Sequence, residues 1–246
     1  MGIESWVEGI LQHRTQMHPV ETEVEPRLRA LRGVKAVVFD IYGTLVISGS
    51  GDVGSADTVG RDSFIRQTLG ELGLRGKLVS VPNADSLQQK IQQLNRERCD
   101  SNCPKPEIDI VEVWRQLLAE HGWLASPSEI EQVVKVATKY EALANPTWPM
   151  PAAAEVLRRL EQARFLLGIV SNAQIFTPCL ISNLLGQTQL EEGGFDLDLC
   201  VFSNRYRQAK PGPRLFEVLR LGLSSRGILP NETIYVGNDM LNDIWA

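Results

Sequence analysis

The segment VKAVVFDIYGTL, residues 34–45, decides how the fold of this chain is predicted. Its first six residues are apolar and rich in β-branched side chains apart from Lys35, which is typical of a strand buried in a parallel sheet. The strand is predicted to end at Asp40, and the tyrosine, glycine and threonine that follow at 42–44 indicate a turn. A carboxylate therefore stands directly after a buried strand, at the edge where open parallel sheets bind ligands.

Alternating strands and helices continue on the carboxyl-terminal side, from Pro146 onward. Strands are predicted over 165–170, 199–202 and 233–236, and helices over 151–163, 175–185 and 213–221. Repeated strand–helix units favour a parallel sheet with helices on both faces. The predicted fold class is therefore α/β, with three layers.

The segment between the first strand and Pro146 has a different pattern. A stretch rich in Gly and Ser at 48–57 indicates a loop, and helices are predicted over 59–72, 85–98, 107–121 and 127–143, with no convincing strand among them. We therefore expect an all-helical module at 48–145, inserted into a core made of 34–47 and 146–246. Helices at 3–14 and 21–33, the second amphipathic, are expected to form an N-terminal extension at 1–33.

Composition excludes several classes of function. The 246 residues carry 25 Lys and Arg against 30 Asp and Glu, a net charge of −5, whereas a nucleic-acid binder needs a basic face. No apolar run approaches the about 18 residues that span a bilayer, and the N-terminus lacks the basic start of a signal peptide. Four cysteines do not make a disulfide framework, and Cys99 and Cys103 lack the partners of a zinc site. We expect a cytoplasmic protein without membrane or nucleic-acid partners.

Polar side chains follow three of the predicted strands, and a lysine precedes a predicted helix. These residues are Asp40, then Ser171 and Asn172, then Asn238, Asp239 and Asp243, with Lys210 before the helix. Because the ends of parallel strands meet at one edge of a sheet, we expect these side chains to converge. A carboxylate nucleophile, a hydroxyl, a fixed cation and a pair of acids suit phosphoryl transfer, and the acids can hold Mg²⁺ through oxygen.

Four segments resemble the motifs of one known family. The segments VFDIYGTL at 38–45, IVSN at 169–172, Lys210-Pro211 and VGNDMLND at 236–243 look like motifs I to IV of the haloacid dehalogenase (HAD) superfamily, in the same order. About 130, 40 and 30 residues separate successive motifs, which is similar to the spacing in that family. The resemblance covers residues 34–246 and implies a three-layer, Rossmann-like HAD core in which the helical insertion is a C1-type cap.

The resemblance implies roles for the residues around the nucleophile. Asp40 would attack and form an aspartyl intermediate. Thr44 and Ser171 would hydrogen-bond the nucleophile or the transferring group, with Asn172 beside them in motif II, and Lys210 would orient the nucleophile and offset negative charge. The expected activity is that of a hydrolase whose substrate is a small phosphorylated molecule.

The same resemblance implies a Mg²⁺ site. Asp40, Asp239 and the backbone carbonyl of Tyr42 would be its protein ligands. Asp243 would hold the motif III lysine or a metal-bound water, and Asn238 stands where some relatives carry a further acid.

One position departs from the phosphatase pattern. Family phosphatases usually carry Asp two residues after the nucleophile, where it protonates the leaving group, but Tyr42 stands there. A phenol with a pKa near 10 is a poor proton donor, and loss of general acid–base help costs about 10² to 10⁴ in rate. The Asp-x-Tyr pattern resembles the metal-independent 2-haloacid dehalogenases, whereas Asp239 and Asp243 in motif IV resemble the metal-binding phosphatases.

Three functions therefore stay open. The sequence favours Mg²⁺-dependent hydrolysis of a phosphomonoester or acyl phosphate, ahead of metal-independent dehalogenation of a 2-haloacid. The third is a non-catalytic member of the family that binds a phosphorylated ligand or a protein. The chain ends at Ala246, soon after motif IV, which predicts either a sheet that ends early or a truncated form. A sheet edge left exposed would favour a dimer.

Overall fold

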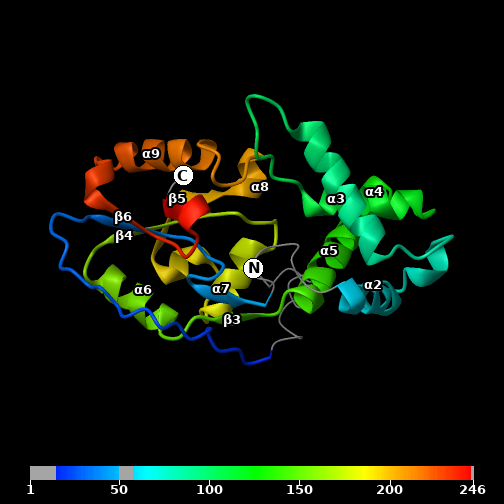
Figure 1. Ribbon diagram of the computed structural model, residues 1–246, viewed down its shortest axis with the longest axis horizontal. Coiled ribbons are helices and arrows are strands. Elements are labelled where there is room, and N and C mark those ends of the chain that lie inside the picture. The colour runs from blue at the N-terminus through cyan, green and yellow to red at the C-terminus, as the bar shows by residue number, and fades with distance from the viewer. Residues whose placement is uncertain (1–14, 50–57, 245–246) are drawn as a thin grey trace.

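The computed structural model describes residues 15–49 and 58–244 and centres on a four-stranded parallel sheet. The strand order is β5–β4–β1–β6, with β1 at Ala36–Phe39, β4 at Leu166–Ser171, β5 at Phe195–Phe202 and β6 at Thr233–Val236 (Figure 1). β1 pairs with β4 on one side and with β6 on the other, so Phe39 lies opposite both Ile169 and Val236. The neighbouring strands β4, β1 and β6 therefore end at the same edge of the sheet.

Helices cover both faces of this sheet. They are α6 (Ala153–Gln162), α7 (Thr177–Leu184), α8 (Ser203–Tyr206) and α9 (Arg214–Ser225). Val37 and Phe39 of β1 belong to the apolar cluster that includes α6 and α7, whereas Ala36 and Val38 belong to the one that includes α9. All four side chains are at most 6% exposed, which explains why this strand lacks polar alternation. The arrangement confirms the predicted three-layer α/β class.

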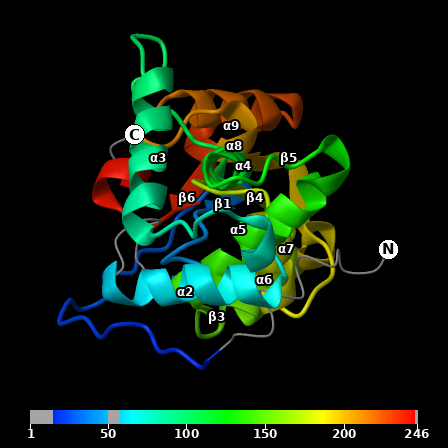
Figure 2. The same ribbon diagram turned by 90° about the vertical axis from the view of Figure 1, so that its right-hand side faces the viewer.

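A third apolar cluster joins four helices beside the sheet, and we call these helices the helical module. They are α2 (Thr58–Glu71), α3 (Ala84–Arg98), α4 (Ile110–Glu120) and α5 (Ile130–Ala144). Figure 2 views the molecule from the side of these helices, with the sheet behind them. Trp114 of α4 is fully buried and meets Tyr140 of α5 edge-on, with ring centroids 5.2 Å apart. Asn83 and Ser86 form the capping box that begins α3.

Short elements complete the described chain. They are the 3₁₀ turns η1 (Arg75–Lys77), η2 (Pro127–Glu129), η3 (Leu190–Gly193) and η4 (Pro230–Glu232), and the π-helical turn η5 (Met240–Ile244). Within residues 15–49 and 58–244, no helix is both long and apolar enough to cross a membrane.

A two-stranded ribbon joins the helical module to the sheet. β2 (Val46–Ser48) and β3 (Thr147–Pro149) pair antiparallel, with Ile47 opposite Trp148. The sequence does not predict either strand, because three residues are too few to show an alternating pattern. The ribbon holds the two ends of the inserted segment side by side.

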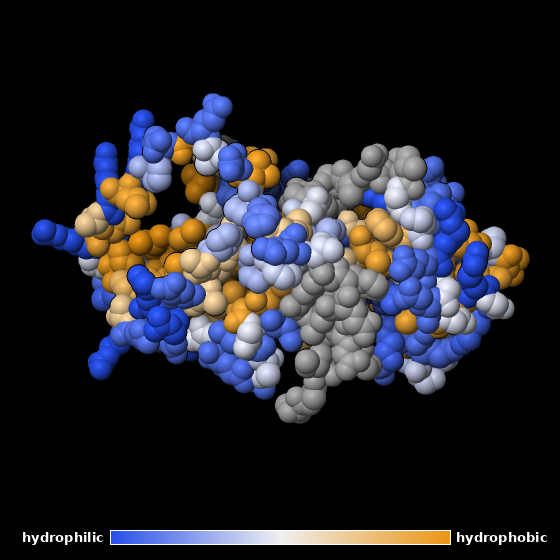
Figure 3. Space-filling model, turned by 90° about the horizontal axis from the view of Figure 1, so that it is seen from below, coloured by the Kyte–Doolittle hydropathy of each residue, from blue (hydrophilic) through white to orange (hydrophobic). Residues whose placement is uncertain are grey.

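The N-terminal segment differs from its prediction. Residues 21–33 form no helix, and Val24 and Leu28 are 77% and 92% exposed. Pro26 stands in the middle of the expected helix, where it removes a backbone donor, and an apolar stripe that remains exposed adds no packing energy to hold a short helix. Figure 3 shows apolar residues (orange) exposed among hydrophilic ones (blue) at the left end of the molecule. The helix expected at 3–14 lies outside the described residues.

Candidate active site

The carboxyl-terminal edge of the sheet holds a cavity of about 250 Å³, which we call the sheet-edge cavity. The loops after β1, β4 and β6 meet there because these strands are neighbours. The cavity is lined by Asp40, Tyr42, Ser171, Asn172, Lys210, Asn238, Asp239 and Asp243, together with Ser48, Asn145 and Asn242. Thr44 does not line it, but its hydroxyl donates to Asn238 Oδ1 at 3.4 Å. The structure thus brings together Asp40 and Asp243, from the first and the last strand–loop segments of the described chain.

Lys210 is held inside the site, with its side chain only 3% exposed. Its Nζ donates to Asp40 Oδ1 at 2.7 Å and to Asp243 Oδ1 at 2.5 Å. It also lies 3.1 Å from Tyr235 Oη and 3.4 Å from the carbonyl oxygen of Val170. An ammonium group held between two buried carboxylates has its charge balanced by protein rather than by water, and its position is fixed.

Asp243 is itself held on both carboxylate oxygens. Its Oδ2 accepts from Asp239 N at 2.9 Å, and the Tyr235 hydroxyl lies 3.0 Å from its Oδ1 and 2.9 Å from the carbonyl oxygen of Val170. Gly237 leaves room for this side chain, because a Cβ at that position would stand 2.6 Å from Asp243 Cβ. The sequence does not single out Tyr235, since a tyrosine inside a strand is an ordinary packing residue.

Asp40 is a buried carboxylate that faces a single cation. Its side chain is 9% exposed, and its backbone N donates to Val236 O at 2.8 Å. Burial raises the pKa of Asp40, against the opposing effects of the Lys210 ammonium and of a hydrogen bond from Ser171. Asn172 Oδ1 accepts from the backbone N of Lys210 at 2.7 Å, which ties motif II to the loop that carries the lysine.

Tyr42 makes its polar contact away from the cluster around Lys210. Its hydroxyl lies 3.0 Å from Thr177 Oγ1, in the first turn of α7. Burial, and then the nearby carboxylate of Glu141, raise the pKa of Tyr42 above its ordinary value, so the phenol gives up its proton even less readily than in water. The turn after Tyr42 needs Gly43, whose φ is +82° and whose added Cβ would stand 2.6 Å from Asn238 Cγ.

Asp239 begins the turn η5 and stays ionised. Its Oδ1 accepts from the backbone N of Leu241 and of Asn242, both at 2.8 Å, and its Oδ2 accepts from Asn242 Nδ2 at 2.9 Å. The hydrogen bond from Asn242 N is the main reason that the pKa of Asp239 is lowered. A carboxylate has about four lone-pair sites, so this group can still bind a cation through Oδ2.

The charged residues that line the sheet-edge cavity leave an excess of negative charge. They are Asp40, Asp239, Asp243 and Lys210, so three carboxylates face one ammonium and the formal charge is −2. In the described part of the chain, no three His, Cys, Asp or Glu side chains gather closely enough to enclose a metal ion. Mg²⁺ commonly keeps several waters and takes only one or two carboxylates from a protein. Asp40 and Asp239 in the lining of this cavity match that donor chemistry.

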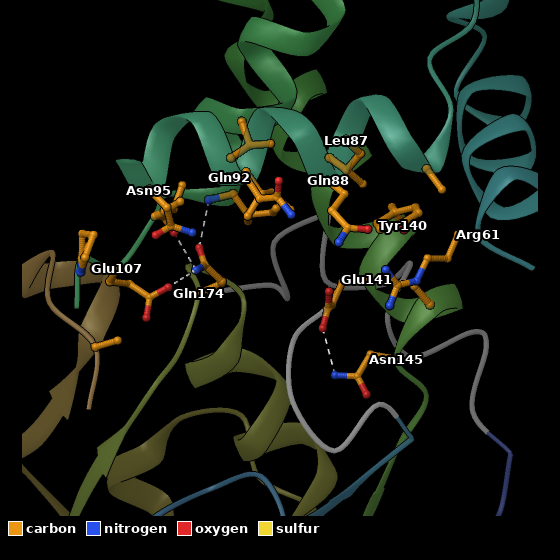
Figure 4. Close-up of a pocket in the computed structure, with 18 residues that line it drawn as sticks. Arg61, Leu87, Gln88, Gln92, Asn95, Glu107, Tyr140, Glu141, Asn145 and Gln174 are labelled. Atoms are coloured by element: carbon orange, nitrogen blue, oxygen red, sulfur yellow. Dashed lines mark hydrogen bonds between the residues drawn. The ribbon is translucent and has the colours of Figure 1, made fainter. Parts of the chain in front are cut away.

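A second cavity, of about 310 Å³, lies between the helical module and the sheet, and we call it the module cavity (Figure 4). Two of its walls carry carboxylates that the sequence does not single out. Glu107 accepts from Ser203 Oγ at 2.6 Å and from Gln174 Nε2 at 2.7 Å, and burial raises its pKa to about 7. Glu141 accepts from Asn145 Nδ2 at 2.9 Å, and burial raises its pKa too. Neither glutamate belongs to a motif, so only the structure identifies them.

Known proteins resemble this chain in sequence pattern and in fold. A family of hydrolases described as haloacid dehalogenase-like matches residues 34–246. A 2-haloacid dehalogenase from Pseudomonas syringae pv. Tomato DC3000 is similar in structure, with a TM-score of 0.57 and 20% identity over 86% of this chain and 81% of that one. No curated protein matches the chain.

Two further solved structures are similar at lower scores. An L-2-haloacid dehalogenase from Xanthobacter autotrophicus has a TM-score of 0.43 and 23% identity, over 85% of this chain and 71% of that one. A HAD phosphatase from Thermococcus onnurineus has a TM-score of 0.46 and 18% identity, over 86% of this chain and 80% of that one.

Proposed function

Because the chain belongs to the haloacid dehalogenase-like hydrolases, we propose that it hydrolyses a small phosphomonoester or acyl phosphate with Asp40 as the nucleophile. Mg²⁺ would be held by Asp40, Asp239 and the backbone carbonyl of Tyr42. In this proposal the helical module, with its linkers at 48–145, acts as a cap over a core formed by 34–47 and 146–246.

The charge of the sheet-edge cavity is the observation that carries this proposal. Three carboxylates face one ammonium there, so an anionic substrate that enters alone meets a formal charge of −2. A divalent cation cancels that charge and makes the cavity able to accept a phosphate. A metal-independent reaction on a 2-haloacid would instead place the substrate carboxylate among three protein carboxylates, which is unfavourable in a partly buried site.

The contacts of Lys210 support a role for Asp40 as the nucleophile. Lys210 holds Oδ1 of Asp40, which leaves Oδ2 to attack phosphorus, and the bond from phosphorus to the leaving oxygen breaks with its electron pair on that oxygen. Water then attacks the phosphorus of the aspartyl phosphate, which releases phosphate and restores the carboxylate. Lys210 and the hydroxyl of Ser171 offset the negative charge on the phosphoryl oxygens. When bound, Mg²⁺ would supply further positive charge to the site.

The position of Tyr42 restricts the leaving group. Its hydroxyl is engaged with Thr177, and its pKa is raised, so it is a poor proton donor to a departing alkoxide. Substrates whose leaving oxygen departs without a proton, such as acyl and aryl phosphates, are therefore expected to react faster than simple alkyl phosphates.

A 2-haloacid dehalogenase is the second candidate, and Tyr42 is the observation that favours it. Attack of Asp40 on carbon expels a halide, which needs no proton, so a tyrosine in place of the acid would cost nothing. That reaction should not depend on a metal.

The test is the hydrolysis of p-nitrophenyl phosphate and acetyl phosphate by the purified protein, with Mg²⁺ and with EDTA. The variant Asp40→Asn removes the nucleophile, and Asp85→Asn, at an exposed position in the first turn of α3, is the matched control. We expect turnover that EDTA and Asp40→Asn both abolish and that Asp85→Asn preserves. Halide release from 2-chloropropionate that persists in EDTA would instead establish the second candidate. Absence of both reactions would favour the non-catalytic alternative.

A further inference from the structure

The module cavity adjoins the site at the sheet edge through a third, smaller cavity. This connecting cavity, of about 190 Å³, shares Tyr42 and Asn172 with the sheet-edge cavity. It shares Glu107, Glu141 and Gln174 with the module cavity. A substrate with its reacting group at Asp40 therefore has room to extend past Tyr42 and into the module cavity.

One wall of the module cavity is a row of carboxamides. Gln88, Gln92 and Asn95 lie at intervals of four and three residues along α3, which places them on one face of the helix (Figure 4). Their side-chain amides make no hydrogen bond with any residue of the described chain. Each amide offers two donors and one acceptor, and a hydroxyl group can serve as partner to either. This wall therefore suits a ligand that carries several hydroxyl groups.

The charges of the cavity disfavour a ligand with a second anionic group. Among the described residues, the lining of the connecting cavity includes Glu107 and Glu141 and no cation, and the lining of the module cavity adds one cation, Arg61. The positive charge of Arg61 already lowers the pKa of Glu141 and so opposes the effect of burial on that carboxyl. A place where burial disfavours the charged form of two glutamates disfavours a ligand carboxylate for the same reason.

The aliphatic side chains of the lining, two of them on α3 itself, and the size of the cavity limit the ligand further. Leu87, Ile91 and Ile108 present aliphatic surface, which can pack against the C–H face of a ring or carbon chain. A volume of about 310 Å³ is at the lower end of ligand pockets, which run from about 300 to 1,000 Å³. Tyr140 is the one aromatic side chain that the described residues contribute to the lining, and it is buried and packs edge-on against Trp114, which disfavours a ligand that binds by stacking.

We propose that the module cavity binds the leaving group of the substrate, and that this group is a neutral, polyhydroxylated ring or chain of the size of a monosaccharide. This inference rests on the proposed function, since it takes the phosphoryl group to lie at Asp40. Within this class, a phosphate on the anomeric oxygen suits the site best, because that oxygen departs more readily than a primary alkoxide when no acid protonates it.

Three ring phosphates of matched size test the inference by binding alone. They are glucose 1-phosphate, cyclohexyl phosphate, which lacks the hydroxyl groups, and glucuronic acid 1-phosphate, which adds a carboxylate. Their dissociation constants are measured by titration calorimetry with the Asp40→Asn variant in Mg²⁺, so that no turnover interferes. We expect glucose 1-phosphate to bind about tenfold more tightly than either of the others, as two or three additional hydrogen bonds allow. Equal or tighter binding of cyclohexyl phosphate or of glucuronic acid 1-phosphate, or no binding of any of the three, overturns the inference.

Variants in the same background assign the effect to the cavity. Gln92→Leu should reduce the preference for glucose 1-phosphate over cyclohexyl phosphate, and Glu141→Gln should reduce the preference over glucuronic acid 1-phosphate. Gln89→Leu is the matched control, because Gln89 is exposed on α3 outside the cavity lining, and it should leave all three dissociation constants unchanged. Preferences that survive both cavity variants overturn the assignment. If the wild type hydrolyses p-nitrophenyl phosphate but the three ligands do not bind in this order, the proposed function stands and the inference about the leaving group is wrong. If the ligands bind in this order but there is no turnover, the inference about the cavity is supported and the proposed chemistry is wrong.

Discussion

Replacing Lys210 by methionine keeps the length of the side chain and removes its ammonium group. Asp40 and Asp243, whose side chains are 9% and 1% exposed, would lose the cation that they share. Removing one partner of a buried ion pair typically costs about 3 to 5 kcal/mol, because it leaves an uncompensated buried charge. The Tyr235 hydroxyl, 3.0 Å from Asp243 Oδ1, would remain as a donor, so we expect a loss near the lower value, about 3 kcal/mol at pH 8.

The loss should depend on pH in a defined direction. Burial already raises the pKa of Asp40, and Lys210 is the strongest influence that lowers it, so the pKa rises further in the variant. A carboxyl whose folded pKa lies above its unfolded value of about 3.9 destabilises the protein at high pH, and the penalty disappears as the pH falls below that value. The stability gap between wild type and Lys210→Met should therefore be larger at pH 8 than at pH 5.

Urea unfolding followed by circular dichroism at the two pH values measures this gap. Lys77→Met is the matched control, because Lys77 pairs with Glu129 at 3.2 Å on the surface, with the lysine side chain 49% exposed, and such a pair contributes at most about 1 kcal/mol. Adding Asp243→Asn to Lys210→Met should recover part of the lost stability. A loss below about 1 kcal/mol for Lys210→Met at pH 8, or a gap that does not change with pH, would show that Lys210 is solvated and would refute the reasoning.

Two further predictions follow from close packing and from burial. Gly237→Ala should lower the unfolding free energy by about 1 to 3 kcal/mol, because the new Cβ would stand 2.6 Å from Asp243 Cβ. Gly76→Ala is the control, because a Cβ there has nothing within 4 Å and should change chemical denaturation little. Equal losses of stability in the two variants would contradict this prediction. Glu107 has a folded pKa of about 7 against 4.5 unfolded, so its protonation stabilises the fold below about pH 4.5, and this stabilisation is lost as the pH rises through about 7. The melting temperature of Glu107→Gln relative to that of the wild type should therefore be higher at pH 8 than at pH 5. The same relative melting temperature at both pH values would show that Glu107 titrates normally.

Local patterns predict the sheet and the residues at its edge. The apolar run that ends before Asp40 is typical of a strand buried on both faces, and the run that leads to Ser171 has the same character. The strand before Gly237 is an edge strand and is only partly buried. Since the carboxyl ends of parallel neighbours meet, these strand ends had to converge whatever the details of packing. The α/β class and the cluster of side chains around Asp40 and Lys210 are predictable on this basis, whereas the family is inferred from the resemblance of the four motifs.

The helix expected at 21–33 shows where local pattern alone is insufficient. Its apolar positions are spaced as in an amphipathic helix, but a short helix is stable only when a surface buries that stripe. The sequence contains the stripe and not the surface, and Pro26 removes a backbone hydrogen bond as well.

What the sequence by itself determined is therefore the strands of the parallel sheet, their polar ends and the residues that meet there. Only the tertiary structure decided which other groups surround that meeting point. Tyr235 contacts Asp243 from within β6. Glu107, in the linker before α4, and Glu141, in α5, line the connecting cavity beside Tyr42. Their contacts join segments far apart in the chain, and a contact of that kind depends on how whole layers pack, which no local spacing of residue types records.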